Sequence, residues 1–139
     1  MIVLDTNVLS EPLKQRPDEH VLAWFASLDE EACVTAISVG ELLTGVRALP
    51  AGRRRAGLLE AIEATLLAFA GSVLVYDEAA ARHCARLQES RRGDGRPLAV
   101  EDGMIAAICV TRGAGLATRN TSDFAGLGLD LIDPWAATN

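Results

Sequence analysis

Short runs dominated by apolar residues recur along the chain, and each ends abruptly at polar or acidic residues. The runs cover residues 2–4, 32–36, 73–76, 116–118 and 129–132. Continuous apolar runs of this kind are typical of strands that are buried on both faces of a parallel sheet. Longer segments between them repeat apolar residues at helical spacing. The pattern predicts one α/β domain over residues 1–139, with a central, mainly parallel sheet of about five short strands flanked by helices.

Helix starts can also be located in the pattern. Residues 17–19 place a proline and two acids at the start of one helix, and Asp77 is a candidate cap for another. Ser38 and Glu41 match the capping-box pattern ahead of an apolar helical segment, which gives Glu41 a purely structural interpretation.

Residues 100–110 form a segment that is apolar almost all round, so the pattern predicts a buried helix. An acid pair nevertheless stands at its start. Asp102 shares a helical face with Ile105, whereas Glu101 lies about 100° away, nearer Met104. The helical phase alone does not decide which of the two acids has a functional role.

Four acids follow the expected strands at comparable places. Asp5 follows the first run directly, Glu41 lies in the first turn after the second, and Asp123 follows the fourth. Asp102 begins the buried helix. Because parallel strands present their carboxyl ends at one edge of the sheet, these side chains are expected to converge there. The alternative for Asp5 or Thr6 is that it only caps the following helix.

Carboxylates that converge without a cation repel one another, so such a cluster favours a bound divalent metal ion. Mg²⁺ prefers carboxylate oxygen ligands, and Mn²⁺ accepts the same ligands. No His or Cys stands at matching positions, which argues against zinc. The predicted cofactor is therefore Mg²⁺, with Mn²⁺ as a substitute.

Composition restricts the setting of this chemistry. The net charge of −6 argues against a protein that coats nucleic acid non-specifically but leaves a nuclease open. Three widely spaced cysteines are expected to be reduced, which favours a cytoplasmic location. No signal peptide is expected, and the longest apolar stretch is too short for a membrane span.

Four motifs follow one another along the chain and together span essentially all of it. They are residues 2–7 (Ile-Val-Leu-Asp-Thr-Asn), 38–42 (Ser-Val-Gly-Glu-Leu), 102–107 (Asp-Gly-Met-Ile-Ala-Ala) and 117–124 (Ala-Thr-Arg-Asn-Thr-Ser-Asp-Phe). These motifs closely resemble those of PIN-domain proteins. The best match is the VapC toxin branch and its FitB-like members.

The resemblance implies a Mg²⁺-dependent endoribonuclease that hydrolyses RNA phosphodiester bonds with metal-activated water. The protein would be the toxin of a type II, VapBC-like toxin–antitoxin pair. Its expected partners are RNA, a cognate VapB-like antitoxin and a second copy in a homodimer, which could enter a larger complex with the antitoxin. No membrane partner is expected.

The resemblance also assigns roles to individual residues. Asp5 and Asp102 become the first-choice metal ligands, Glu41 a third acid acting directly or through water, and Asp123 the fourth. The matched position is Asp102 and not Glu101. Supporting polar or substrate-contacting roles fall to Thr6, Asn7, Arg119 and Asn120.

Three other functions share part of this pattern. A metal-dependent phosphatase of the haloacid-dehalogenase type would need a second Asp two residues after Asp5, where this chain has Asn7. A receiver domain would need a well-placed lysine, and Lys14 is the only lysine present. The remaining alternative is a catalytically silent PIN-like module that acts through protein partners, which the intact set of acids disfavours.

Overall fold

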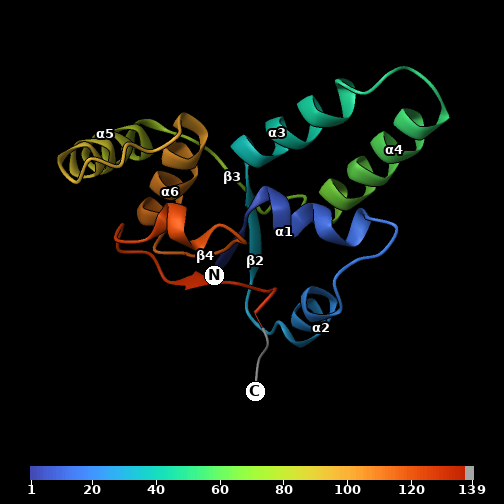
Figure 1. Cartoon of the computed structure of the whole chain (residues 1–139), viewed down its shortest axis with the longest axis horizontal. Coiled ribbons are helices and arrows are strands. Elements are labelled where there is room, and N and C mark those ends of the chain that lie inside the picture. The colour runs from blue at the N-terminus through green and yellow to red at the C-terminus, as the bar shows by residue number, and fades with distance from the viewer. Residues whose placement is uncertain (137–139) are drawn as a thin grey trace.

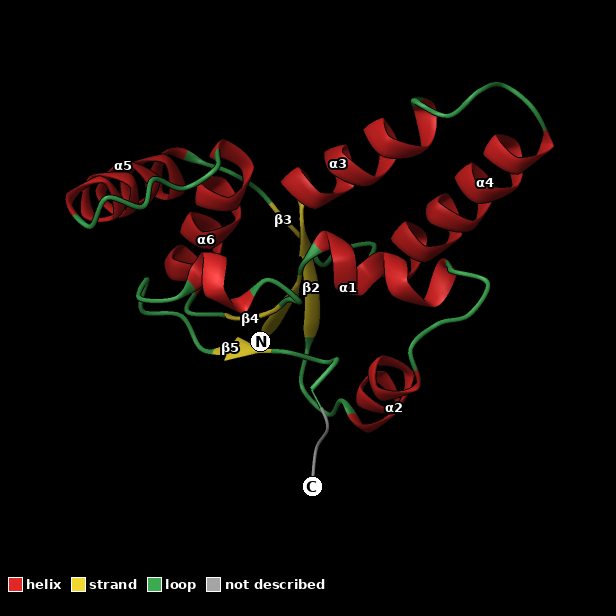
Figure 2. Ribbon diagram, in the orientation of Figure 1, coloured by secondary structure: helices red, strands yellow, loops and turns green. Residues whose placement is uncertain are grey.

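A five-stranded sheet forms the centre of the computed structural model, which describes residues 1–136 (Figures 1 and 2). Every strand pairing is parallel, and the strand order is β3-β2-β1-β4-β5. The predicted mainly parallel α/β architecture is therefore confirmed. The strands are β1 (Ile2–Leu4), β2 (Ala32–Thr35), β3 (Val73–Leu74), β4 (Gly115–Ala117) and β5 (Leu131–Ile132).

Strand β1 occupies the middle of the sheet, with β2 and β4 as its neighbours. Ile2, Val3 and Leu4 are each 0% exposed. Burial on both faces explains why the run is apolar without alternation. Ile2 pairs with Ala32 on one side and with Gly115 on the other, so the first strand fixes the register of its two neighbours.

Two layers of helices cover the sheet. One core cluster joins α5 and α6 to one face, and a second joins α1, α3 and α4 to the other (Figure 1). Within residues 1–136, no helix is long and apolar enough to cross a membrane. The helical elements are α1 (Thr6–Ser10), η1 (Glu11–Leu13), α2 (Glu19–Ser27), α3 (Ala36–Arg47), α4 (Arg53–Ala68), α5 (Glu78–Gly93), α6 (Val100–Arg112) and η2 (Thr121–Phe124).

Helix α6 confirms the expectation of a buried helix. Ile105 and Ile108 are 1% and 0% exposed, and Gly103 is also buried. Gly113 ends the helix with φ 62°, in the left-handed region that favours glycine. Asp102 thus lies in the first turn of a helix whose orientation is fixed by the core.

The two edge strands are shorter than the sequence pattern indicated. Residues 73–76 were expected to form a strand, but β3 contains only Val73–Leu74, and Val75 is 60% exposed. Residues 129–132 contribute only Leu131–Ile132 to β5. Each edge strand pairs with one neighbour only, so fewer of its residues are held in the ladder.

The predicted capping box is wrong. Helix α3 begins at Ala36, and Thr35 is its N-cap, because the Thr35 hydroxyl accepts a 3.1 Å hydrogen bond from the Ser38 backbone N–H. Glu41 therefore lies in the second turn of α3, not the first, and does not cap the helix. Its carboxylate is free to point toward the carboxyl edge of the sheet.

Candidate active site

Asp5 lies directly after the central strand and is 6% exposed. Its Oδ1 accepts a 2.8 Å hydrogen bond from the Thr6 backbone N–H, and its Oδ2 accepts a 2.7 Å hydrogen bond from the Thr118 hydroxyl. Burial raises the pKa of Asp5, and the two hydrogen bonds oppose that rise. Asp5 is also the N-cap of α1, so the expected capping role is present. The cap does not exclude a role for Asp5 in the acid cluster.

Thr118 was missing from the set of residues predicted from the sequence. It is 0% exposed, and its hydroxyl also accepts a 3.0 Å hydrogen bond from the Asn120 backbone N–H. Its position follows from the register: Leu4 pairs with Ala117, so one residue further along places Thr118 beside Asp5. A polar residue at the end of the run at 116–118 was the available signal.

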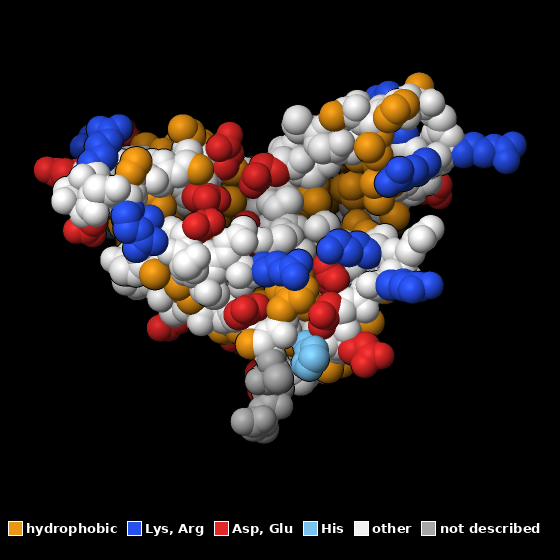
Figure 3. All heavy atoms as spheres, viewed as in Figure 1, with side chains coloured by type: hydrophobic (Ala, Val, Ile, Leu, Met, Phe, Trp, Pro, Cys, Tyr) orange, Lys and Arg blue, Asp and Glu red, His pale blue; other side chains and the backbone are white. Residues whose placement is uncertain are grey.

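Asp102 is the acid most affected by its surroundings. Burial, followed by the charges of Asp5, Asp123, Glu41 and Glu101, raises its pKa to about 6. Asp5, Glu41 and Asp123 therefore all lie within electrostatic reach of Asp102. Figure 3 shows acidic side chains gathered at the notch between the α6 side of the molecule and α3.

The two acids at the start of α6 differ in exposure. Asp102 is partly buried, whereas Glu101 is exposed, although its charge still acts on Asp102. Asp102 faces the sheet edge because it shares a helical face with the buried Ile105.

Glu41 is hydrogen-bonded to Thr6, a residue of the first motif. Thr6 Oγ1 donates a 3.1 Å hydrogen bond to Glu41 Oε1, which links α1 to α3. Partial burial raises the pKa of Glu41, and the charges of Asp5 and Glu101 add to that rise, while the Thr6 hydrogen bond lowers it. Thr6 therefore orients one of the predicted acids.

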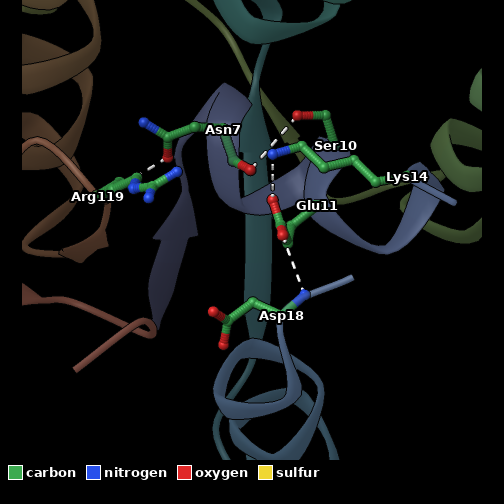
Figure 4. A network of polar contacts seen from close by, with 6 residues as sticks. All are labelled: Asn7, Ser10, Glu11, Lys14, Asp18 and Arg119. Carbon is green, nitrogen blue, oxygen red and sulfur yellow. Dashed lines mark hydrogen bonds and ion pairs between the residues drawn. The ribbon is translucent and has the colours of Figure 1, made fainter. Parts of the chain in front are cut away.

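The remaining supporting residues connect the segment after β4 to α1. Asn7 Oδ1 accepts a 3.3 Å hydrogen bond from the Arg119 backbone N–H (Figure 4). The Arg119 guanidinium lies 5.1 Å from the centroid of the Trp135 ring, so this side chain stacks on an aromatic face. Asn120 is exposed, and its backbone N–H binds the Thr118 hydroxyl.

Glu11 is a second residue that was not predicted from the sequence, and its contacts lie outside the acid cluster, in the polar network of Figure 4. It is 4% exposed; Oε1 accepts a 3.0 Å hydrogen bond from the Asp18 backbone N–H, and Oε2 lies 2.8 Å from Lys14 Nζ. The carboxylate ties η1 to the start of α2. The signal in the sequence was an acid three residues before the single lysine.

The donor chemistry of the acid cluster fits a hard divalent cation. Only carboxylates converge there, and neither the Asp102 nor the Asp123 side chain has a hydrogen bond or ion pair to any other residue in the range 1–136. Burial raises the pKa of the nearby Cys109 thiol to about 12, so this group is not a thiolate ligand.

The acids do not, however, form a closed metal cage. Across the part of the chain that the structure describes, no three His, Cys, Asp or Glu side chains are gathered closely enough to hold a metal ion. The carboxylates therefore have the right chemistry but are more widely spaced than the ligands of a formed metal site.

An open groove leads away from this cluster. It has a volume of about 1200 Å³ and runs between α1, α3 and α4. Thr6 and Glu41 line the end nearest the acids, and Arg53 and Arg54 line it at the start of α4. Figure 3 shows basic side chains on this side of the molecule, so the groove joins an acidic end to a basic one.

Sequence comparison identifies relatives along the whole chain. The PIN domain family model matches residues 2–128. The VapC ribonuclease Y4jK of Sinorhizobium fredii is 46% identical over 97% of this chain and 98% of its own length. Toxin FitB of Neisseria gonorrhoeae is 39% identical over 97% of this chain and 99% of its own length.

Solved structures with the same fold agree with these relatives. A chain of the FitAB complex bound to the IR36 DNA fragment is 38% identical, with a TM-score of 0.93, covering 100% of this chain and 99% of that one. A chain of VapBC-5 from Mycobacterium tuberculosis, a member of the VapBC family of toxin–antitoxin systems, is 30% identical, with a TM-score of 0.69 and coverage of 94% and 95%. The chain therefore belongs to the PIN-domain family, in the branch that contains the VapC and FitB toxins.

Proposed function

We propose that this protein is a Mg²⁺-dependent endoribonuclease and the toxin of a type II, VapBC-like toxin–antitoxin pair. The observation that carries the proposal is the acid cluster around Asp102. The charges of Asp5, Asp123 and Glu41 all act on this one carboxyl group at the carboxyl edge of a parallel sheet. That edge is where open α/β sheets bind their ligands.

Each acid has a distinct part in the proposed site. Asp5 and Asp102 are the ligands that the fold holds most firmly, since one follows the central strand and the other starts the buried helix. Glu41 and Asp123 complete the set, directly or through water. A divalent cation bound there would activate water and stabilise charge on the scissile phosphate.

Hydrogen bonds from neutral side chains prepare two of these acids for the role. Thr118 holds Oδ2 of Asp5, and Thr6 holds Oε1 of Glu41. Both bonds favour the ionised carboxylate, which is the form that binds metal. Mn²⁺ is the expected substitute because it accepts the same oxygen ligands.

The groove beside the cluster is the proposed path of the RNA strand. Arg53 and Arg54 line it at a distance from the acids, and arginine binds phosphate oxygens through two parallel hydrogen bonds. A strand held there would run from a basic region to the proposed metal site. The name of the relative Y4jK, a VapC ribonuclease, supports RNA as the substrate.

The proposed partners are a VapB-like antitoxin and a second copy of this chain. Support for the antitoxin comes from the matched FitAB and VapBC-5 complexes. Leu67 on α4 is 75% exposed and lies in an apolar groove with Leu43 and Val73, a surface suited to a protein partner. The cytoplasm, where RNA and the antitoxin are found together, is the proposed location.

Cleavage of RNA tests the enzymatic part of the proposal. Purified protein is incubated with bulk tRNA and ribosomal RNA, with Mg²⁺ or Mn²⁺ and with EDTA. We expect fragments only with metal, and none from the Asp102→Asn variant. Asp29→Asn is the matched control, because Asp29 is exposed in the loop before β2. Cleavage in EDTA, or full activity in Asp102→Asn, contradicts the mechanism.

Co-expression tests the toxin part. The chain is expressed alone and together with the product of the adjacent reading frame. We expect growth arrest when it is expressed alone and a stable purified complex when the two are expressed together. If the protein cleaves RNA but its expression alone does not slow growth, the nuclease activity is supported and the toxin role is contradicted. Metal-bound protein that cleaves no RNA would instead favour a silent interaction module.

A further inference from the structure

Arg91, near the end of α5, is a charged side chain that is almost completely buried. It is 5% exposed, whereas its neighbours Ser90 and Arg92 are exposed. No carboxylate within residues 1–136 pairs with it. A buried charge is unfavourable unless it is hydrogen-bonded, so the partners of this guanidinium explain why it is placed there.

Its partners are backbone carbonyl oxygens. Nη2 donates to the carbonyl of Asp123 at 2.5 Å and to that of Ala125 at 2.9 Å, and Nη1 donates to that of Arg96 at 3.4 Å. Asp123 lies within η2, and Ala125 is the residue that follows its end. Carbonyls at the end of a short helix lack partners within it, and the guanidinium supplies them.

The same short helix is held at two further points. Arg96 Nη2 donates a 3.0 Å hydrogen bond to the Ser122 carbonyl, and the Phe124 side chain is 1% exposed in the core. Asp123 therefore has its own carbonyl bound by Arg91, with an anchored residue on each side. Its carboxylate remains exposed and within electrostatic reach of Asp102.

Helix α5 also anchors the segment that leads into α6. Gln88, one turn before Arg91, donates to the Leu98 carbonyl at 3.2 Å and accepts from the Leu98 backbone N–H at 3.3 Å. A Cβ atom on Gly103 would lie 2.9 Å from Gln88 Nε2, so the glycine permits this close approach. Gln88 and Arg91 share one face of α5.

One face of α5 therefore contacts η2, which carries Asp123, and the segment that leads into α6, which carries Asp102. We propose that Arg91 is a positioning residue: by holding the η2 backbone, it sets Asp123 against Asp102 and so determines how tightly the cluster binds a divalent cation. The proposal rests on the proposed function. Arg91 lies outside the four sequence motifs, so its positioning role was not predicted from them.

Metal affinity in a double-mutant cycle separates this role from simple stabilisation. Binding of Mn²⁺ is followed by the loss of the free Mn²⁺ electron paramagnetic resonance signal, without any RNA. In Arg91→Lys the charge remains but the planar fork is lost, and we expect Mn²⁺ binding to weaken about tenfold, as for other residues that orient metal ligands. The control Arg92→Lys alters an exposed arginine of the same helix and should bind Mn²⁺ as the unaltered chain does.

The cycle is completed with Asp123→Asn. If Arg91 acts through Asp123, adding Arg91→Lys to Asp123→Asn changes Mn²⁺ affinity by less than about twofold, because the coupled residue is already lost. Equal weakening in both backgrounds, or unchanged affinity in Arg91→Lys, overturns the proposal. Should Arg91→Lys not fold, Arg96→Met removes the Ser122 contact instead and should weaken Mn²⁺ binding in the same direction.

The outcome is distinguishable from failure of the proposed function. Mn²⁺ binding with normal coupling but no RNA cleavage would refute the nuclease and leave the positioning role intact. RNA cleavage together with Mn²⁺ binding that does not change in Arg91→Lys would support the nuclease and refute the positioning role. Absence of Mn²⁺ binding by the unaltered chain would overturn both.

Discussion

The Thr118 hydroxyl donates a 2.7 Å hydrogen bond to Oδ2 of Asp5, and the two residues follow neighbouring parallel strands. Thr118 is 0% exposed and Asp5 is 6% exposed, so water competes little for this contact. The bond fixes the orientation of the first acid of the cluster. It also opposes the rise in the pKa of Asp5 that burial causes.

Replacing Thr118 by Val keeps the shape of the side chain and removes its hydroxyl. A buried carboxylate then loses a donor, so we expect the free energy of unfolding to fall by about 1–3 kcal/mol. RNA cleavage should fall about tenfold or more, as for other residues that orient metal ligands. Urea denaturation and cleavage rates measure the two effects.

Thr118→Ser is the matched control, because it keeps the hydroxyl and removes only a methyl group. It should retain most of the activity that Thr118→Val loses. Equal losses in the two variants would show that packing, and not the hydrogen bond, matters at this position.

The central part of the fold could be predicted from the sequence because burial there has a simple signature. The apolar run at residues 2–4 and the buried helix at 100–110 are apolar on all sides, and both were confirmed. The edges were harder to predict. Val75 belongs to an apolar run but is 60% exposed and lies just beyond β3, an edge strand that within residues 1–136 pairs only with β2.

Within the candidate site, the positions of the acids at the ends of strands and the starts of helices could be predicted from the sequence. The residues that orient these acids through hydrogen bonds could not. Asp5 and Asp102 stand where strands end or helices begin, and the strand order brings them together. Thr118 and Arg91 act through contacts with segments 113 and 32 residues away in the chain. Pairings of that kind require the register of the sheet and the packing of α5, which no local pattern contains.

The capping box shows how a local pattern can mislead. Ser38 and Glu41 have the correct spacing, but Thr35 lies three residues earlier and is the last residue of β2. The helix begins as soon as the strand ends, so the earlier hydroxyl becomes the cap. The pattern marked the helix correctly and its first residue wrongly.

Replacing Thr35 by Val removes the α3 cap while keeping the buried shape of the side chain. The Ser38 backbone N–H loses its 3.1 Å partner, and we expect the free energy of unfolding to fall by about 1 kcal/mol. Thermal unfolding followed by circular dichroism measures the change. Glu41→Ala is the comparison, because alanine cannot complete a capping box. If Glu41 stabilised the helix as a cap, this variant would lose stability to a similar extent, and we expect no such loss.

Divalent metal should stabilise the protein through the acid cluster. At a Mn²⁺ concentration ten times the Kd, binding adds about 1.4 kcal/mol to the free energy of unfolding, which raises the Tm by a few degrees. In Asp102→Asn we expect this metal-dependent rise to disappear. Differential scanning fluorimetry with and without Mn²⁺ measures it.

The same variant should have the opposite effect without metal. Burial and the neighbouring acids raise the pKa of Asp102 to about 6. At neutral pH its ionised form, which still predominates, is therefore less favourable in the folded chain than in the unfolded one. Asp102→Asn removes that charge, and the metal-free variant should melt at the same or a higher temperature than the unaltered protein. A metal-free variant that melts lower would argue against repulsion within the cluster.

Glu11 should give the protein a part of its stability that depends on pH. The hydrogen-bonded ion pair with Lys14 lowers the pKa of Glu11 below its ordinary value of 4.5. For a carboxyl group of lowered pKa, the stabilisation is fully present above the ordinary value and is lost as the pH falls through the folded value. We therefore expect the free energy of unfolding to fall on acidification below about pH 4.5, in the direction that this linkage requires.

Glu11→Gln tests the assignment because it removes this titration and keeps the size of the side chain. At pH 7 we expect the variant to be less stable by about 1–3 kcal/mol, since Lys14 and the Asp18 backbone N–H lose a charged partner. As the pH falls below 4.5, the difference from the unaltered protein should shrink, because protonation then neutralises Glu11 in both states of that protein. Urea denaturation at pH 7, 5 and 3.5 measures the difference, and a gap that stays constant over this range would contradict the role of the Glu11–Lys14 pair. RNA cleavage at pH 7 should be unchanged, because this network lies outside the acid cluster.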